Sequence, residues 1–198
     1  MLIPNLIKQA YQQYECFKAE VPWTTEGLVA VLSAKPKGLF QQLRPYGFIA
    51  NIENQTYVVF RGTDSFADWL VNADFDQVKH PLGVVHDGAY HLYRQMQIPR
   101  LDNPIIVGHS LGCWMATYAA VDQTNPTVRL YAAPRAGDVE FAKNYNKLIP
   151  DTLRIVNTED IVPTLPPPGN WCHIGKAQCF TVGGGTVTER HSMETYSQ

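Results

Sequence analysis

A short segment in the middle of the chain, bounded by glycines, carries the clearest chemical pattern. Residues 108–112 read G-H-S-L-G, which places Ser110 at the centre. A buried apolar run at 104–107 comes directly before this segment, and a helical pattern at 111–121 comes directly after it. A serine in a sharp strand-to-helix turn stands beside unpaired helical N–H groups, which stabilise a developing negative charge. The pattern therefore indicates that Ser110 is a nucleophile.

A serine hydroxyl needs a general base, and two histidines follow Ser110 in the chain. His191 comes after the expected last strand and three consecutive glycines, on a terminal loop that can reach over a sheet. His173 lies before that strand and would have to reach across from the wrong end. His191 is therefore predicted to be the base, with His173 as the alternative.

The base in turn needs a carboxylate that orients it. Asp160 follows the strand expected at 153–156 by a few residues and is held in place by Val162 and Pro163. We predict that Asp160 is this acid, and a solvated loop carboxylate is the alternative role. The other downstream candidates are Asp122, Asp138, Asp151 and Glu159.

Strands and helices alternate around these residues. An amphipathic helix is expected at 3–17 and a hairpin is expected from two extended runs, 47–52 and 56–60. Alternation in the second half predicts a mainly parallel sheet that is covered by helices. The expected helices there are 88–97, 111–121 and 140–148, and the expected strands are 104–107, 127–131, 153–156 and 179–182.

Composition and charge exclude several classes of protein. With 198 residues, 45% hydrophobic, the chain suits one globular domain, 1–198. A net charge of −2 with scattered Lys and Arg argues against nucleic acid as a partner. No run approaches the ~20 apolar residues that span a bilayer, and the start of the chain lacks the apolar run of a secretory signal. The expected location is therefore the cytoplasm, or export by a non-classical route.

The cysteines and histidines do not suggest a metal site. Cys113 follows the serine on an apolar helix and is expected to be a buried thiol. Cys172 and Cys179 are close enough in sequence to form a disulfide, or they are free thiols. The histidines show no paired ligand spacing, so neither a metal nor another cofactor is expected.

Several motifs in order resemble the fungal-type triacylglycerol lipases, also called class 3 lipases, from about residue 57 to 196. The strand-to-helix turn at 108–112, called the nucleophile elbow, is one of them, and the terminal H-S-M at 191–193 with Tyr196 is another. The others are F-R-G-T at 60–63, H-D-G at 86–88, P-R-A-G-D at 134–138, R-I-V-N at 154–157, D-I-V-P at 160–163, L-P-P at 165–167 and H-I-G at 173–175.

The resemblance implies an α/β-hydrolase fold and hydrolysis of fatty-acyl ester lipids through an acyl-enzyme, with possible transient contact to a lipid interface. It implies a triad of Ser110, Asp160 and His191, with an oxyanion hole formed by the backbone N–H groups of Thr63 and Leu111. A phospholipase, a galactolipase and a small-ester esterase are alternatives within the same chemistry. A catalytically silent relative that binds a lipid or a partner protein is the alternative outside it.

The segment 65–72 begins two residues after Thr63 and carries Phe66, Trp69 and Leu70 at helical spacing. Asp64 or Ser65 can cap such a helix. The corresponding stretch in fungal-type lipases is a mobile helix that covers the serine. We expect a small lid here, and permanent packing of these side chains on the core is the alternative.

Overall fold

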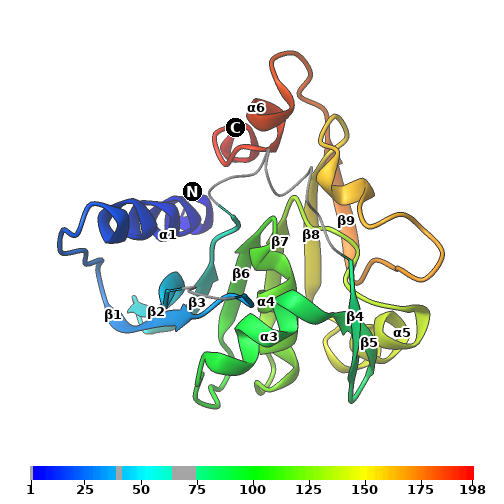
Figure 1. Cartoon of the computed structure of the whole chain (residues 1–198), viewed down its shortest axis with the longest axis horizontal. Coiled ribbons are helices and arrows are strands. Elements are labelled where there is room, and N and C mark those ends of the chain that lie inside the picture. Colours follow the sequence, from blue (N-terminus) through cyan, green and yellow to red (C-terminus); the bar gives the residue numbers. More distant parts are fainter. Residues whose placement is uncertain (1, 39–41, 64–74) are drawn as a thin grey trace.

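A seven-stranded sheet organises the computed structural model, which describes residues 2–38, 42–63 and 75–198 (Figure 1). The strand order is β1-β2-β3-β6-β7-β8-β9. The first two pairs are antiparallel and the other four are parallel, so the predicted mainly parallel sheet is confirmed. The strands are β1 (Leu28–Ala34), β2 (Arg44–Ile52), β3 (Gln55–Phe60), β6 (Ile105–His109), β7 (Thr127–Tyr131), β8 (Thr152–Asn157) and β9 (Lys176–Phe180).

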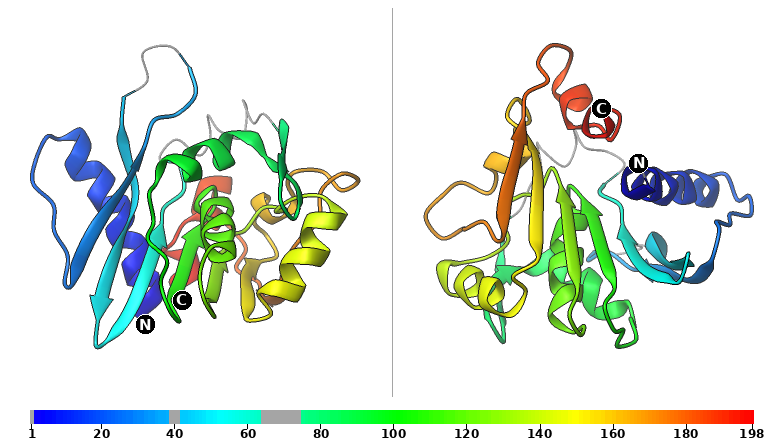
Figure 2. Two further views of the ribbon diagram at one scale, coloured as in Figure 1. Left: turned by 90° about the horizontal axis from the view of Figure 1, so that it is seen from below. Right: turned by 180° about the vertical axis from the view of Figure 1, so that it is seen from behind.

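Helices cover both faces of this sheet (Figure 2). One face packs against α1 (Leu2–Lys18) and the C-terminal segment, which holds α6 (Val187–His191) and a 3-10 turn, η2 (Thr195–Ser197). The other face packs against α3 (Asp87–Gln95), α4 (Gly112–Val121) and α5 (Val139–Leu148). Another 3-10 turn, η1 (Val162–Thr164), follows β8.

Alternation along the central strands produces the two cores. In β3, Val58 belongs to the core on the α4 side and Val59 to the core on the α1 side. In β6, Ile106 and Val107 divide in the same way. Because successive side chains of a strand point to opposite faces, a continuous apolar run is required where helices cover both faces.

The predicted hairpin is confirmed as β2 and β3, which pair from Gly47 with Phe60 to Ile52 with Gln55. Glu53 and Asn54 form its tip, with φ angles of 51° and 63°. Two successive positive φ angles are typical of the tight turn that matches the twist of the flanking strands.

Two expectations about the C-terminal part were wrong. The last strand is Lys176–Phe180 instead of 179–182, and it pairs with β8 over residues 153–157. His191 lies at the last position of α6 and not on a loop. That short helix is held by a capping box, in which the Thr186 side chain accepts the Glu189 N–H and the Glu189 side chain accepts the Thr186 N–H.

Three strands were not predicted from the sequence. The edge strand β1 is one, and the others form a small antiparallel sheet, β4 (Gln77–His80) with β5 (Gly83–His86).

All four cysteines are free thiols, Cys172 and Cys179 included. Within the described ranges, no helix is both long and apolar enough to cross a membrane.

Candidate active site

The segment around Ser110 forms a sharp turn between β6 and α4. Ser110 has a φ of 56°, a left-handed conformation that non-glycine residues seldom adopt. The flanking glycines allow a close approach of backbones. A Cβ on Gly108 would lie 2.6 Å from the Gly112 carbonyl oxygen, and a Cβ on Gly112 would lie 2.6 Å from the carbonyl oxygens of Phe60 and Arg61. This turn therefore requires glycine at both places.

A Gly112→Ala substitution should destabilise the fold by about 1–3 kcal/mol, because the added methyl group forces α4 away from β3. Gly183→Ala is the matched control, since its Cβ would meet only the Glu159 side chain at 3.8 Å. Denaturant unfolding of both variants checks the expectation. Equal stability of the two proteins would contradict it.

The structure brings Ser110, His191 and Asp160 together in one buried relay. The Ser110 Oγ lies 2.8 Å from His191 Nε2, and His191 Nδ1 lies 2.8 Å from Asp160 Oδ2. The three residues are only 2%, 4% and 3% exposed. The carboxylate can only accept, so Nδ1 carries the proton and Nε2 is left to accept the serine O–H.

Asp160 accepts two further hydrogen bonds that fix its orientation. The Val162 N–H donates to Oδ1 at 3.0 Å, and the Tyr196 hydroxyl donates to Oδ2 at 2.8 Å. Burial, and then the charge of Asp160, raises the pKa of Tyr196, which keeps its phenol protonated as a donor. A carboxylate with three donors stays in one rotamer, as a residue that orients a histidine must.

Asn157, at the end of β8, joins this carboxylate loop to α6. Its side-chain N–H groups donate to the carbonyls of Val182 at 3.1 Å and Arg190 at 3.2 Å. Its side-chain oxygen accepts the Val182 N–H at 3.0 Å, and its backbone N–H donates to the Tyr196 hydroxyl at 3.0 Å. Asn157 is completely buried, so these bonds hold the segment with His191 against the sheet.

The other candidate bases and acids lie outside the relay. His173 donates through Nε2 to the Pro163 carbonyl at 2.9 Å. The four remaining carboxylates have structural contacts: Asp122 accepts from Tyr93, Asp138 caps α5, Asp151 pairs with Arg129 at 2.8 Å, and Glu159 pairs with Arg190 at 3.8 Å.

His173 should make the fold sensitive to mild acid. Burial, and then the positive charge of Arg154, lowers the pKa of His173 from 6.5 to about 4. Between pH 4 and 6.5 the His173 of the unfolded chain therefore binds a proton that the folded chain excludes. The contribution of neutral His173 to the free energy of unfolding is fully present above pH 6.5 and is lost as the pH falls toward 4. The difference between the two pKa values corresponds to about 3 kcal/mol in the free energy of unfolding. Denaturant unfolding between pH 4 and 7 should show that His173→Gln loses less stability on acidification than the wild type does. Parallel curves of unfolding free energy against pH would show that His173 is not the acid-sensitive group.

The predicted oxyanion-hole residues lie beside the relay. Leu111 follows Ser110 directly, and within the described residues its N–H has no hydrogen-bond acceptor. Thr63 and His191 both line a cavity of about 280 Å³ between α1 and α6. The expected lid, with Phe66, Trp69 and Leu70, lies outside the described residues.

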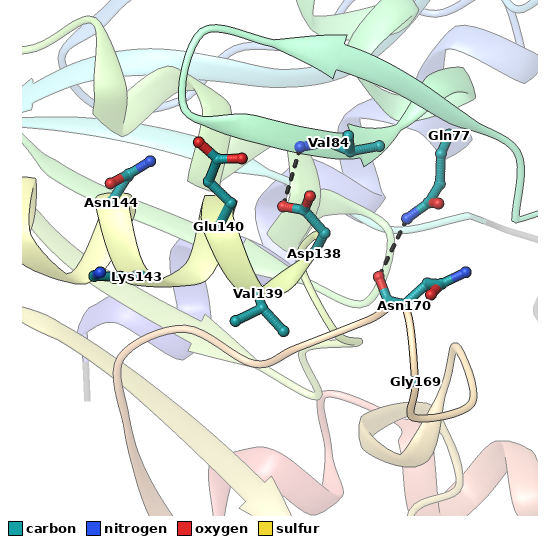
Figure 3. Close-up of a pocket in the computed structure, with 9 residues that line it drawn as sticks. All are labelled: Gln77, Val84, Asp138, Val139, Glu140, Lys143, Asn144, Gly169 and Asn170. Carbon is teal, nitrogen blue, oxygen red and sulfur yellow. Dashed lines mark hydrogen bonds between the residues drawn. The ribbon is translucent and has the colours of Figure 1, made fainter.

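A second hollow of about 760 Å³ lies between the β4–β5 hairpin, α5 and the loop at 169–170 (Figure 3). Asp138 in its wall accepts the Val84 N–H at 3.1 Å, and Gln77 donates to the Asn170 carbonyl at 3.3 Å. None of Ser110, Asp160 and His191 lines it. Among the described residues there is also no group of three His, Cys, Asp or Glu that could hold a metal ion.

The sequence model of the class 3 lipases matches residues 57–170, more than half of the chain. The chain belongs to the class 3 lipase family. The lipase of Rhizomucor miehei is 29% identical over 154 residues, which cover 65% of this chain and 42% of that protein. Secreted mono- and diacylglycerol lipase A of Penicillium cyclopium is 34% identical over 142 residues (61% and 46%). Phospholipase A1-II 4 of rice, Oryza sativa subsp. japonica, is 38% identical over 193 residues (70% and 48%).

Solved structures agree with this membership at the level of the fold. The chain superimposes on the triacylglyceride lipase of Rhizomucor miehei with a TM-score of 0.68 at 23% identity, over 90% of this chain and 78% of that one. The predicted α/β-hydrolase fold is thereby confirmed. The class 3 lipase chain described here spans less than half the length of the curated relatives named above.

Several residues that hold the site were not singled out from the sequence. Tyr196 was part of a recognised segment but had no assigned role, and Asn157 and Tyr11 had none either. The N-cap pattern of Thr186 and Glu189 was a readable signal for α6. No local pattern indicates the contacts of Asn157 or Tyr11, because their partners lie far away in the chain.

Proposed function

We propose that this chain is a serine carboxylic ester hydrolase that cleaves fatty-acyl esters through an acyl-enzyme at Ser110. The relay from Ser110 through His191 to Asp160, with both contacts at 2.8 Å, is the observation that supports it most. Membership in the class 3 lipases supports the same chemistry. We further infer a single domain over residues 1–198, because one sheet runs from β1 to β9.

The chemistry follows from the directions of the hydrogen bonds. His191 Nε2 takes the Ser110 proton as Oγ attacks the ester carbonyl, and Asp160 stabilises the imidazolium. The N–H groups of Leu111 and Thr63 stabilise the tetrahedral oxyanion. His191 then returns the proton to the leaving alcohol, and water, activated by the same base, releases the fatty acid from Ser110.

Phospholipid is the second candidate substrate, and the 38% identity to the rice phospholipase A1 favours it. The bond that breaks is again a carboxylic ester, so the relay serves both substrates equally. A lipid substrate also implies transient contact between this chain and a lipid–water interface.

Rates on p-nitrophenyl esters of increasing acyl length, with and without lipid vesicles, test this proposal. We expect hydrolysis that depends on Ser110, with higher rates on longer acyl chains. Triacylglycerol emulsions and phosphatidylcholine vesicles in parallel assays separate the two substrate classes. A folded wild-type chain that hydrolyses none of these esters faster than Ser110→Ala would overturn the proposal and favour a silent lipid-binding or protein-binding relative.

A further inference from the structure

A chain of hydrogen bonds on the α1 side of the site takes no part in the proton relay. The Gly62 N–H lies 3.0 Å from the Tyr11 hydroxyl, and that hydroxyl lies 2.7 Å from His109 Nδ1. His109 Nε2 lies 2.9 Å from the carbonyl oxygen of His191. These residues come from α1, the segment after β3, the end of β6 and the end of α6, so the chain joins four separate parts of the fold.

The direction of each bond follows from its partners. The His191 carbonyl can only accept, so His109 Nε2 carries a hydrogen. His109 is 3% exposed, and burial, followed by electrostatic repulsion from the neighbouring His191, lowers its pKa well below the usual value, so the ring is neutral. Nδ1 is then an acceptor for the Tyr11 O–H, whose oxygen accepts the Gly62 N–H.

Gly62 is wedged between this chain and the nucleophile. A Cβ at Gly62 would lie 2.6 Å from the Tyr11 hydroxyl and 2.7 Å from Ser110 Cβ. The Gly62 N–H is already bound to Tyr11, so it is not available to an oxyanion. The Gly62 N–H belongs to the peptide unit directly before the one that carries the Thr63 N–H, so Tyr11 restrains the backbone one residue before Thr63.

We propose that Tyr11 and His109 are positioning residues that hold the Thr63 segment and the His191 segment at fixed places on either side of Ser110. His109 secures the backbone of His191, and Tyr11 secures Gly62. The inference rests on the proposed hydrolase function, because its measured effect is on ester turnover.

Tyr11→Phe tests the first half, with Tyr14→Phe as the matched control. Tyr14 lies on the same helix, its ring packs on the Arg61 guanidinium at 3.7 Å, and its hydroxyl has no hydrogen bond among the described residues. We expect kcat to fall by about 10- to 100-fold in Tyr11→Phe with little change in KM, as for other small misplacements of catalytic groups. Phosphonate labelling of Ser110 should slow in parallel.

Substitutions of His109 test the second half. His109→Gln keeps a donor near the Nε2 position, and His109→Asn keeps an acceptor near the Nδ1 position. His109→Leu keeps neither. We expect the glutamine and asparagine variants each to retain more turnover than the leucine variant at comparable melting temperatures.

Two outcomes would overturn the inference while the wild type is active. One is a Tyr11→Phe turnover equal to that of Tyr14→Phe. The other is a His109→Leu turnover equal to those of the glutamine and asparagine variants. This second result would overturn the inference even if Tyr11→Phe does not fold. A wild type without esterase activity would contradict the proposed function itself.

Discussion

Replacing Ser110 by alanine should lower ester hydrolysis by about 10⁶-fold, the loss typical of removing a nucleophile from a serine relay. The fold should survive, because the change removes one buried oxygen from a position whose backbone is held by the flanking turn. The backbone N–H of Ser110 donates to the Tyr131 carbonyl at 3.0 Å, a bond that alanine can form equally well. Equal melting temperatures with undetectable turnover are the expected result.

Covalent labelling gives an independent measure of the same residue. An organophosphonate ester should modify Ser110 alone, because His191 Nε2 lies 2.8 Å from its hydroxyl. Ser33 and Ser192 serve as internal controls in the same digest. Peptide mapping that found the adduct on either of them, or full turnover by a folded Ser110→Ala protein, would refute Ser110 as the nucleophile.

Local patterns predicted the central part of the fold well. The strand at β6, the turn at Ser110 and the helix α4 follow from an apolar run, two glycines and a second apolar run. Because both faces of β6 are covered, nearly every side chain there had to be apolar, and the sequence records that requirement directly. Ser110, Asp160 and His191 were chosen as candidates on a different ground, because they follow expected strands in the order serine, acid, histidine that this fold uses.

The edges of the sheet were harder to predict. In β9 the side chains of residues 176–179 are exposed, so no apolar pattern marked where the strand begins. Its limits come instead from backbone pairing with β8 and from Asn157, whose bonds to Val182 hold the chain just beyond the strand end. The other edge, β1, was also missed, although residues 28–32 form a continuous apolar run, L-V-A-V-L, in which Val29 and Val31 are exposed.

The supporting hydrogen bonds of the site could not be predicted at all. Tyr11 and His109 are 98 positions apart, and Asn157 and Tyr196 are 39 apart. A tyrosine on an amphipathic helix is usually a core or surface residue, and nothing local distinguishes the one whose hydroxyl contacts the elbow. Such contacts are defined only once both faces of the sheet are packed, which is why the sequence indicates the candidates Ser110, Asp160 and His191 better than the groups that hold them.

Asp160→Asn should lower turnover by about 10⁴-fold while leaving the fold intact, as the same change does in other serine relays. The amide is nearly isosteric with the carboxylate, and with its oxygen at the Oδ1 position it still accepts the Val162 N–H, so that its NH₂ group takes the Oδ2 position beside His191. Its NH₂ group, however, presents hydrogens where His191 Nδ1–H needs an acceptor. The imidazole is then driven to the tautomer with its proton on Nε2, where it cannot accept the Ser110 proton.

Asp151→Asn is the matched control, because it makes the same chemical change in an exposed ion pair with Arg129. Surface pairs of this kind contribute about 0–1 kcal/mol to stability, so its turnover and melting temperature should stay close to those of the wild type. The decisive measurement is kcat for both variants at several pH values, together with circular dichroism. A folded Asp160→Asn protein that turns over as fast as Asp151→Asn would show that the carboxylate beside His191 does not orient the base.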